Sequence, residues 1–169
     1  MRLSVMFAAS LTLLNPCAAA ELPEYRLKAA YLYNFAQFTS WPADVGKTLR
    51  LCTYGSDPFG AELDGLEDKP VGDRTLRLQR HVRLEDVAVC QVLYVSRGAM
   101  AALPAVQREI AGRPVLLVTD SPGAARRGAM LNMTVAQNRV TFEANRRAAG
   151  DAALDLSFRL LRLATEVIQ

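Results

Sequence analysis

Few residue types in this sequence could carry out catalysis or bind a metal ion. The chain has 169 residues and one histidine, His81, so no second histidine could complete a zinc site with it. A Ser-His-Asp triad would have to be built around His81, and the G-x-S-x-G motif of a nucleophile elbow is absent. We therefore interpret His81 as a surface residue and expect no catalytic residue, no metal ion and no cofactor.

Two cysteines, Cys52 and Cys90, lie at the edges of apolar segments that read as strands, "LRLCTYG" and "CQVLYVS". Neighbouring strands can bring such positions within bonding reach, and two cysteines favour pairing if the domain is exported, as the signal-like residues 1–20 described below predict. A disulfide would leave neither sulfur as a nucleophile. The alternative is two buried free thiols.

The stretch "LCTYGSDPFG", residues 51–60, raises the question of a phosphate cradle, because it joins a predicted strand to a predicted helix. Asp57 suits the N-cap of that helix and Pro58 its first position. An aspartate there occupies the free N–H groups and repels a phosphate. The sequence also lacks a G-x-G-x-x-G or Walker motif. We interpret the turn as scaffold, with ligand contact as the alternative.

A β-hairpin is predicted over "AMLNMTVAQNRVTFEAN", with its turn at Gln137-Asn138. In this register Val135 faces Val140 on the apolar side. Asn132 then faces Glu143 on the polar side, with Asn145 near. These polar residues could bind a ligand or a partner, or could form an ordinary solvated sheet face.

The elements that would position these residues are helices and strands in alternation. A helix is predicted from Tyr25 to Trp41, ended by Pro42, and another over residues 104–111, between the strand segments "CQVLYVS" and "PVLLVTD". Strand–helix–strand implies a parallel crossover, and dense apolar strands imply cover on both faces. A last helix is predicted from Leu154 to Ile168. Its expected buried stripe consists of Leu154, Phe158, Leu161 and Val167. The residues expected to face solvent are Arg159, Arg162 and Glu166.

These elements predict one α/β domain. It has a mixed β-sheet with parallel core strands, a C-terminal antiparallel hairpin, and helices on both faces.

Residues 1–20 have the parts of a cleavable signal peptide: a basic start, a twelve-residue apolar run from Leu3 to Leu14, and small residues at Ala18 and Ala20. The expected mature domain is 21–169, in an exported protein. A membrane anchor is the alternative, but the run is too short to span a bilayer, and lipid attachment at Cys17 is a further one.

The net charge of +3 is too small for a nucleic-acid binder, and no other segment approaches the length of a membrane span.

Five blocks, in order, resemble those of the YfiR family of periplasmic proteins: "LKAAYLYNFAQFTSWP", "LCTYGSDPFG", "GRPVLLVTDSPG", "GAMLNMTVAQNRVTFEAN" and "LDLSFRLLRLA". The resemblance implies a mixed-sheet α/β domain without catalytic activity. It also implies a bridge between Cys52 and Cys90. The second, more C-terminal cysteine pair of the best-known member is absent here.

The resemblance further implies a regulator that binds the periplasmic sensor domain of an inner-membrane diguanylate cyclase and represses it, which lowers cyclic-di-GMP and biofilm formation. Glu143, Asn145 and Arg159 are then the candidates for partner contact. Two other hypotheses remain: a periplasmic small-molecule sensor that reports to another receptor such as a histidine kinase, with Tyr31, Tyr33 and Trp41 lining a pocket, and an enzyme using Glu143 or His81. The sequence leaves a homodimer open.

Overall fold

The computed structural model describes residues 21–136 and 139–169, so the predicted signal peptide and the predicted turn at Gln137-Asn138 lie outside the described residues. The helices are α1 (Glu21–Gln37), α2 (Ala61–Asp64), α3 (Leu103–Glu109), α4 (Arg146–Asp151) and α5 (Phe158–Leu161). The strands are β1 (Thr39–Ser40), β2 (Thr48–Tyr54), β3 (Pro70–Val71), β4 (Arg74–Val82), β5 (Val92–Val95), β6 (Leu116–Thr119), β7 (Leu131–Ala136), β8 (Arg139–Asn145), β9 (Asp155–Leu156) and β10 (Glu166–Ile168). Short 3-10 turns include η2 (Leu84–Val89), η3 (Arg97–Ala102) and η4 (Ala125–Arg127).

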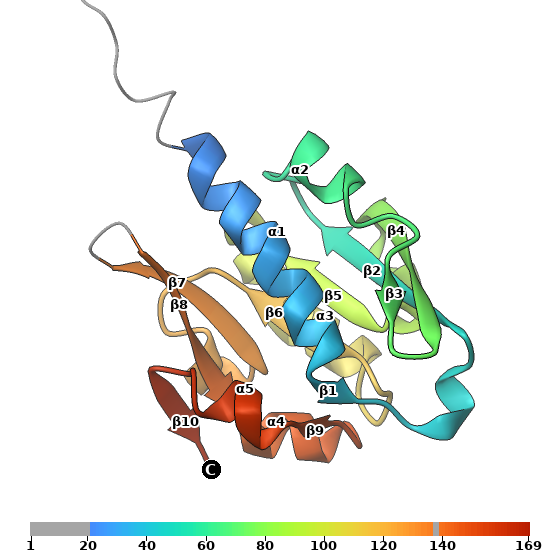
Figure 1. Ribbon diagram of the computed structural model, residues 1–169. Coiled ribbons are helices and arrows are strands. Elements are labelled where there is room, and N and C mark those ends of the chain that lie inside the picture. The colour runs from blue at the N-terminus through green and yellow to red at the C-terminus, as the bar shows by residue number, and fades with distance from the viewer. Residues whose placement is uncertain (1–20, 137–138) are drawn as a thin grey trace, which may run out of the picture.

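The centre of the domain is an eight-stranded sheet with the order β10-β8-β7-β6-β5-β2-β4-β3. The neighbouring strands β4, β2, β5, β6 and β7 pair in parallel, whereas β8 runs antiparallel to β7 and β3 antiparallel to β4. Helix α1 crosses one face of this sheet and α3 lies on the other (Figure 1). The predicted fold, a mixed α/β sheet with parallel core strands and a C-terminal hairpin, is confirmed.

Helix α1 packs on the sheet through an apolar face that contains Leu32 and Phe35, both fully buried. The ring of Phe35 meets that of Phe142 on β8 edge to face, with centroids 5.0 Å apart. The sequence predicted this helix as far as Trp41, but α1 ends at Gln37, because residues 39–40 form β1 and pair with β9. The predicted apolar face is wrong at Leu27, which is 45% exposed.

The hairpin of β7 and β8 has the predicted register. Val135 lies opposite Val140, Met133 opposite Phe142, and Asn132 opposite Glu143. The register follows from alternation alone, because a slip by one residue would turn the apolar set toward the polar side.

The C-terminal segment differs from the prediction of one helix over residues 154–168. It forms β9, the single helical turn α5, and β10, which pairs in parallel with β8. Leu154 is buried as predicted, but Phe158 is 76% exposed, so the predicted apolar stripe is wrong. The physical reason is that strand pairing satisfies the backbone at both ends of the segment, at Leu156 against Thr39 and at Val167 against Ala144.

The turn after β2 is internally bonded. The Asp57 carboxylate accepts a hydrogen bond from the backbone N–H of Phe59 (2.9 Å) and pairs with Arg80. The predicted N-cap role of Asp57 is wrong, since α2 begins four residues later and has Gly60 at its N-cap. At Gly55 the backbone has φ +86°, and an added Cβ would lie 2.5 Å from Ser96 Oγ. These contacts support the interpretation of the turn as scaffold.

Candidate functional site

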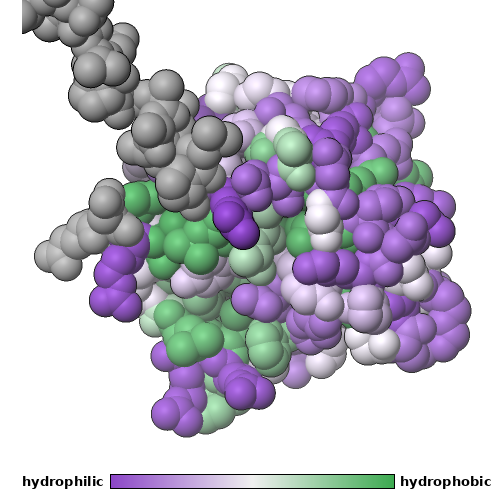
Figure 2. All heavy atoms as spheres, turned by 45° about the horizontal axis from the view of Figure 1, so that its top comes forward, coloured by the Kyte–Doolittle hydropathy of each residue, from purple (hydrophilic) through white to green (hydrophobic). Residues whose placement is uncertain are grey.

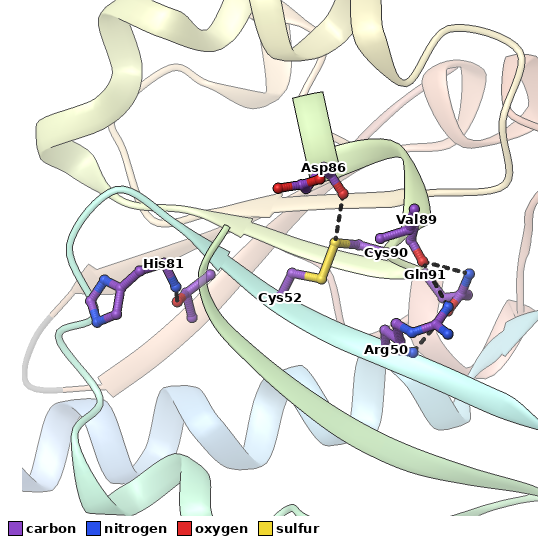
Figure 3. Close-up of a disulfide and its surroundings, with 8 residues drawn as sticks. Arg50, Cys52, His81, Asp86, Val89, Cys90 and Gln91 are labelled. Carbon is purple, nitrogen blue, oxygen red and sulfur yellow. Dashed lines mark hydrogen bonds between the residues drawn. A yellow bond between two sulfur atoms is a disulfide. The ribbon is translucent and has the colours of Figure 1, made fainter. Parts of the chain in front are cut away.

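The two cysteines are joined in a disulfide. Cys52 on β2 and Cys90 after η2 have their Cα atoms 5.9 Å apart, 38 residues apart in sequence, and both are fully buried. Figure 3 shows the bridge beside Asp86, whose carbonyl oxygen lies 3.8 Å from Cys90 Sγ. The bridge therefore ties β2 to the start of β5 across the loop that contains β3 and β4. It is the pairing that the sequence predicted.

A buried ion pair lies at the carboxyl ends of the parallel strands. Lys28 on α1 is fully buried, and its Nζ lies 2.6 Å from Oδ2 of Asp120, the residue that directly follows β6. Lys28 also bonds Glu24, one turn earlier on α1. The hydroxyl of Tyr94 on β5 donates to Asp120 Oδ1 (2.9 Å). Burial, followed by the neighbouring charge of Asp120, raises the pKa of Tyr94 well above its usual value, so its hydroxyl remains a donor at physiological pH.

Arg97 and Tyr25 complete this cluster. The Arg97 Nε–H donates to the backbone carbonyl of Asp120 (2.9 Å) and lies 3.2 Å from its Oδ2. The ammonium of Lys28 lies 4.6 Å from the centroid of the Tyr25 ring. Burial, then the charge of Asp120, raises the pKa of Tyr25. The cluster fixes the first turns of α1 to the ends of β5 and β6.

A pocket of about 460 Å³ opens beside the cluster. It is lined by Glu24, Arg97, Asp120, Pro122, Gly123, Thr134, Val135 and Glu143. Its position at the carboxyl edge of parallel strands is where α/β sheets commonly bind ligands. Figure 2 shows apolar side chains gathered next to the β7–β8 hairpin, and the described residues Leu27 and Val135 are about half exposed.

Glu143 is the predicted residue that the structure places in this pocket. Its Oε2 accepts a hydrogen bond from Asn132 Nδ2 (2.8 Å), as the register implied. Asn132 is fully buried, and its Oδ1 has no hydrogen-bond partner among the described residues. A buried acceptor without a partner is uncommon, and Asn132 lies beneath Glu143 without itself lining the pocket.

Asn145 has an internal role. Its Oδ1 accepts from the backbone N–H of Ala148 and so caps α4, and its Nδ2 donates to the carbonyl of Ala125, each at 2.9 Å. Only 8% of the residue is exposed. Asn145 therefore joins the end of β8 to η4 and α4 and does not line the pocket with Glu143.

Arg159 lies on α5, in a separate hollow of about 480 Å³ with Phe158, Arg162 and Leu163. Its guanidinium carbon lies 5.6 Å from the centroid of the Phe38 ring. The structure thus does not bring the three predicted contact residues together, because Glu143, Asn145 and Arg159 occupy three different places.

Other residues singled out in the sequence are bonded within the chain. His81 is exposed, with φ +52°, and its Nδ1 lies 3.1 Å from the carbonyl of Gly55. The polar atoms of Tyr31, Tyr33 and Trp41 each donate to a backbone carbonyl, those of Val140, Pro70 and Ala36. In residues 21–136 and 139–169, no group of three or more His, Cys, Asp or Glu side chains could hold a metal ion.

Sequence reasoning missed the Lys28–Asp120 cluster, although two signals pointed to it. Lys28 shares the i, i+4, i+7 face of Leu32 and Phe35, so the helical period already placed it against the sheet. Asp120 directly follows the buried strand segment "PVLLVT". A charged residue on an apolar face and a carboxylate at a strand end suggest a buried pair.

Comparison with solved structures supports the fold. A conserved domain protein from Vibrio cholerae O1 biovar El Tor matches with TM-score 0.54 and 10% identity, over 82% of this chain and 59% of that one. The ABC domain from Streptococcus pneumonia, solved in complex with L-Trp, matches with TM-score 0.55 and 11% identity, over 83% of this chain and 60% of that one. The chain thus spans about three fifths of each of these structures.

The family follows from a match across most of the sequence. No helix within the described part of the chain has the length and apolar character needed to cross a membrane. No curated protein matches the sequence. A family model described as YfiR/HmsC-like matches residues 25–165, which include the disulfide, the buried ion pair, the hairpin and α5. The chain belongs to the YfiR/HmsC-like family.

Proposed function

We propose that this protein is an exported, non-catalytic regulator that binds the periplasmic sensor domain of an inner-membrane diguanylate cyclase and represses it. Repression lowers cyclic-di-GMP and biofilm formation. The observation that carries this proposal is the family match over residues 25–165. The signal peptide predicted at residues 1–20 supports action in the periplasm.

The chemistry of the described residues supports a binding role. The charged groups at the sheet edge are satisfied by one another: Asp120 by Lys28, Tyr94 and Arg97. Such a network holds α1 in place against the ends of β5 and β6. We propose Glu143 and Arg159 as contact residues on two surfaces, with Asn145 supporting the end of the hairpin from inside.

The test of this proposal is deletion of the gene followed by complementation. Deletion should raise cellular cyclic-di-GMP, and the full chain should restore the low level. A chain without residues 1–20 should fail to restore it, because it would not reach the periplasm. Unchanged cyclic-di-GMP in the deletion strain, or full restoration by the leaderless chain, would contradict the proposal.

A second candidate function is small-molecule sensing for another membrane receptor such as a histidine kinase, and the pocket beside Glu143 favours it. The pocket has a guanidinium from Arg97 and carboxylates from Glu24 and Glu143. This combination suits a ligand with both an anionic and a cationic group, such as an amino acid. One structural neighbour was solved with L-Trp, which makes L-tryptophan a reasonable first probe.

The sensing hypothesis predicts that an amino-acid ligand raises the melting temperature, since binding to the folded state stabilises it. Glu143→Gln should reduce the shift, and the distant surface variant Lys47→Gln should keep it. A panel of amino acids that leaves the melting temperature unchanged would count against this function.

A further inference from the structure

The corner formed by α5 and the turn after it exposes two large apolar side chains. Phe158 is 76% exposed and Leu163 is 67% exposed, whereas the other exposed large apolar residues, Leu27, Val89 and Val135, are all below 50%. Together with Arg159 and Arg162 they line the hollow of about 480 Å³. Exposed apolar side chains that gather around a hollow, with a polar border, mark an interaction surface.

This corner is held firmly by the structure around it. Ser157 Oγ accepts from the backbone N–H of Leu160 (3.2 Å) and caps α5, and Leu160 is buried. On one side β9 pairs with β1, and on the other β10 pairs with β8. The exposure of Phe158 is therefore a property of the folded corner, and binding there would need little ordering.

The two arginines in the hollow are oriented but not neutralised. The guanidinium carbon of Arg159 lies 5.6 Å from the Phe38 ring centroid, and that of Arg162 lies 5.9 Å from the centroid of Phe158. Neither forms a salt bridge with a carboxylate in the part of the chain that the structure describes. A guanidinium stacked on a ring keeps its edge donors available for a carboxylate.

The C-terminal part of the sequence, residues 121–169, is positively charged overall, as are the two arginines of the hollow. Residues 121–169 hold seven arginines and no lysine, against four carboxylate side chains, so this segment has a net charge of +3. The whole chain has the same net charge of +3. An acidic partner would be attracted to this C-terminal segment, to which Arg159 and Arg162 belong.

We propose that the α5 hollow, defined by Phe158, Arg159, Arg162 and Leu163, docks an acidic protein segment that inserts an apolar side chain between flanking carboxylates. Aromatic and arginine side chains together are typical of the residues that dominate binding energy at protein interfaces. A concave site suits a protruding side chain better than a flat lipid surface. The proposal rests on the proposed function, in which the partner is the sensor domain of the cyclase.

The binding test uses residues 21–169 and a synthetic amphipathic peptide whose leucine face is flanked by glutamates. NMR chemical shifts should change at the α5 hollow, and the matched peptide with lysine for glutamate should bind at least about tenfold more weakly. Phe158→Ser with Leu163→Ser should abolish the shifts, and Arg159→Gln with Arg162→Gln should weaken binding by about tenfold or more. Val89→Ser and Arg113→Gln, exposed residues elsewhere, are the matched controls and should bind as the unmodified chain does.

Three outcomes would overturn the proposal. Equal binding of both peptides would remove the charge argument. Binding of the chain to vesicles of anionic phospholipid through Phe158, without peptide binding, would identify a membrane surface. Self-association that Phe158→Ser abolishes would identify a second copy of the chain as the occupant.

A cellular experiment separates this inference from the proposed function. The Phe158→Ser, Leu163→Ser variant is produced in the deletion strain, with its folding checked by its melting temperature. If deletion raises cyclic-di-GMP but this variant returns it fully to the low level, the docking inference fails and the function stands. If deletion leaves cyclic-di-GMP unchanged, the function fails whatever the peptide does.

Discussion

The ion pair between Lys28 and Asp120 is the feature whose disruption we expect to destabilise the fold most among single charge changes. Both side chains are fully buried, and 92 residues separate them in sequence. The pair joins α1 to the end of β6. We predict that Lys28→Met, which keeps the length of the side chain, destabilises the protein because it leaves the Asp120 charge without its buried cation.

The magnitude follows from what remains around Asp120. Removing one partner of a buried ion pair costs about 3–5 kcal/mol. Asp120 keeps the hydroxyl of Tyr94 and the guanidinium of Arg97, but Arg97 is 53% exposed and its attraction is screened by solvent. We therefore expect about 3 kcal/mol. For a domain of this size that lowers the melting temperature by about 6–12 °C.

The assay is urea unfolding of residues 21–169 with the disulfide intact, followed by circular dichroism. Lys47→Met is the matched control, since Lys47 pairs with Asp73 on the surface, with side chains 78% and 66% exposed. It should cost less than about 1 kcal/mol. The double variant Lys28→Met, Asp120→Asn should cost less than the sum of its two single variants, because both buried charges are then removed.

Two results would refute this reasoning. One is a loss below about 1 kcal/mol for Lys28→Met, equal to that of the surface control. The other is strict additivity of the two single variants, which would show that Lys28 and Asp120 do not interact energetically.

Three further predictions concern the scaffold. Replacing Cys52 and Cys90 by alanine should cost about 4 kcal/mol on the chain-entropy model, and calorimetry should show a melting temperature lower by about 10 °C; a change of only a few degrees would contradict it. The raised pKa of Tyr94 stabilises the fold below about pH 10, the usual value, and this contribution is lost as pH rises further, so Tyr94→Phe should flatten the alkaline part of the stability–pH curve in urea titrations; an unchanged slope would refute the assignment. Asn145→Ala should lower the free energy of unfolding by about 1–2 kcal/mol, and Asn145→Ser should retain most of it; equal losses would argue against the capping role.

The parts of the fold that the sequence predicted well are those in which local alternation and one long-range constraint agree. The hairpin register could be predicted because the apolar residues Val135 and Phe142 must lie on the same face of the hairpin, which only one register allows. The disulfide could be predicted because two cysteines at strand edges, in a domain predicted to be exported, are expected to pair. Glu143 could be placed on the polar face for the same reason as the register.

The C-terminal segment could not be predicted from its own pattern. "LDLSFRLLRLATEVI" has apolar residues at helical spacing, but its ends pair with strands far away in sequence, β1 and β8. Tertiary pairing overrides local preference in such a segment. The same pattern hides the exposed apolar corner, since it places Phe158 in a buried stripe whereas Phe158 is 76% exposed.

The candidate site was predicted only in part, because its charged members come from separate elements. Lys28, Tyr94 and Asp120 approach one another only after α1 crosses the ends of β5 and β6. Each residue taken singly is an ordinary lysine, tyrosine or aspartate. The topology, which no local pattern contains, makes them a cluster.

The most direct test of the central claim is an activity measurement on the cyclase itself. The candidate cyclase is the membrane protein whose own deletion cancels the cyclic-di-GMP rise caused by loss of this protein. It is placed in proteoliposomes with its sensor domain outward, and residues 21–169 are added outside. We predict that synthesis of cyclic-di-GMP falls as the added chain saturates the sensor domain, and that the Arg159→Glu variant inhibits less. An unchanged rate at saturating concentrations of the unmodified chain would contradict the account.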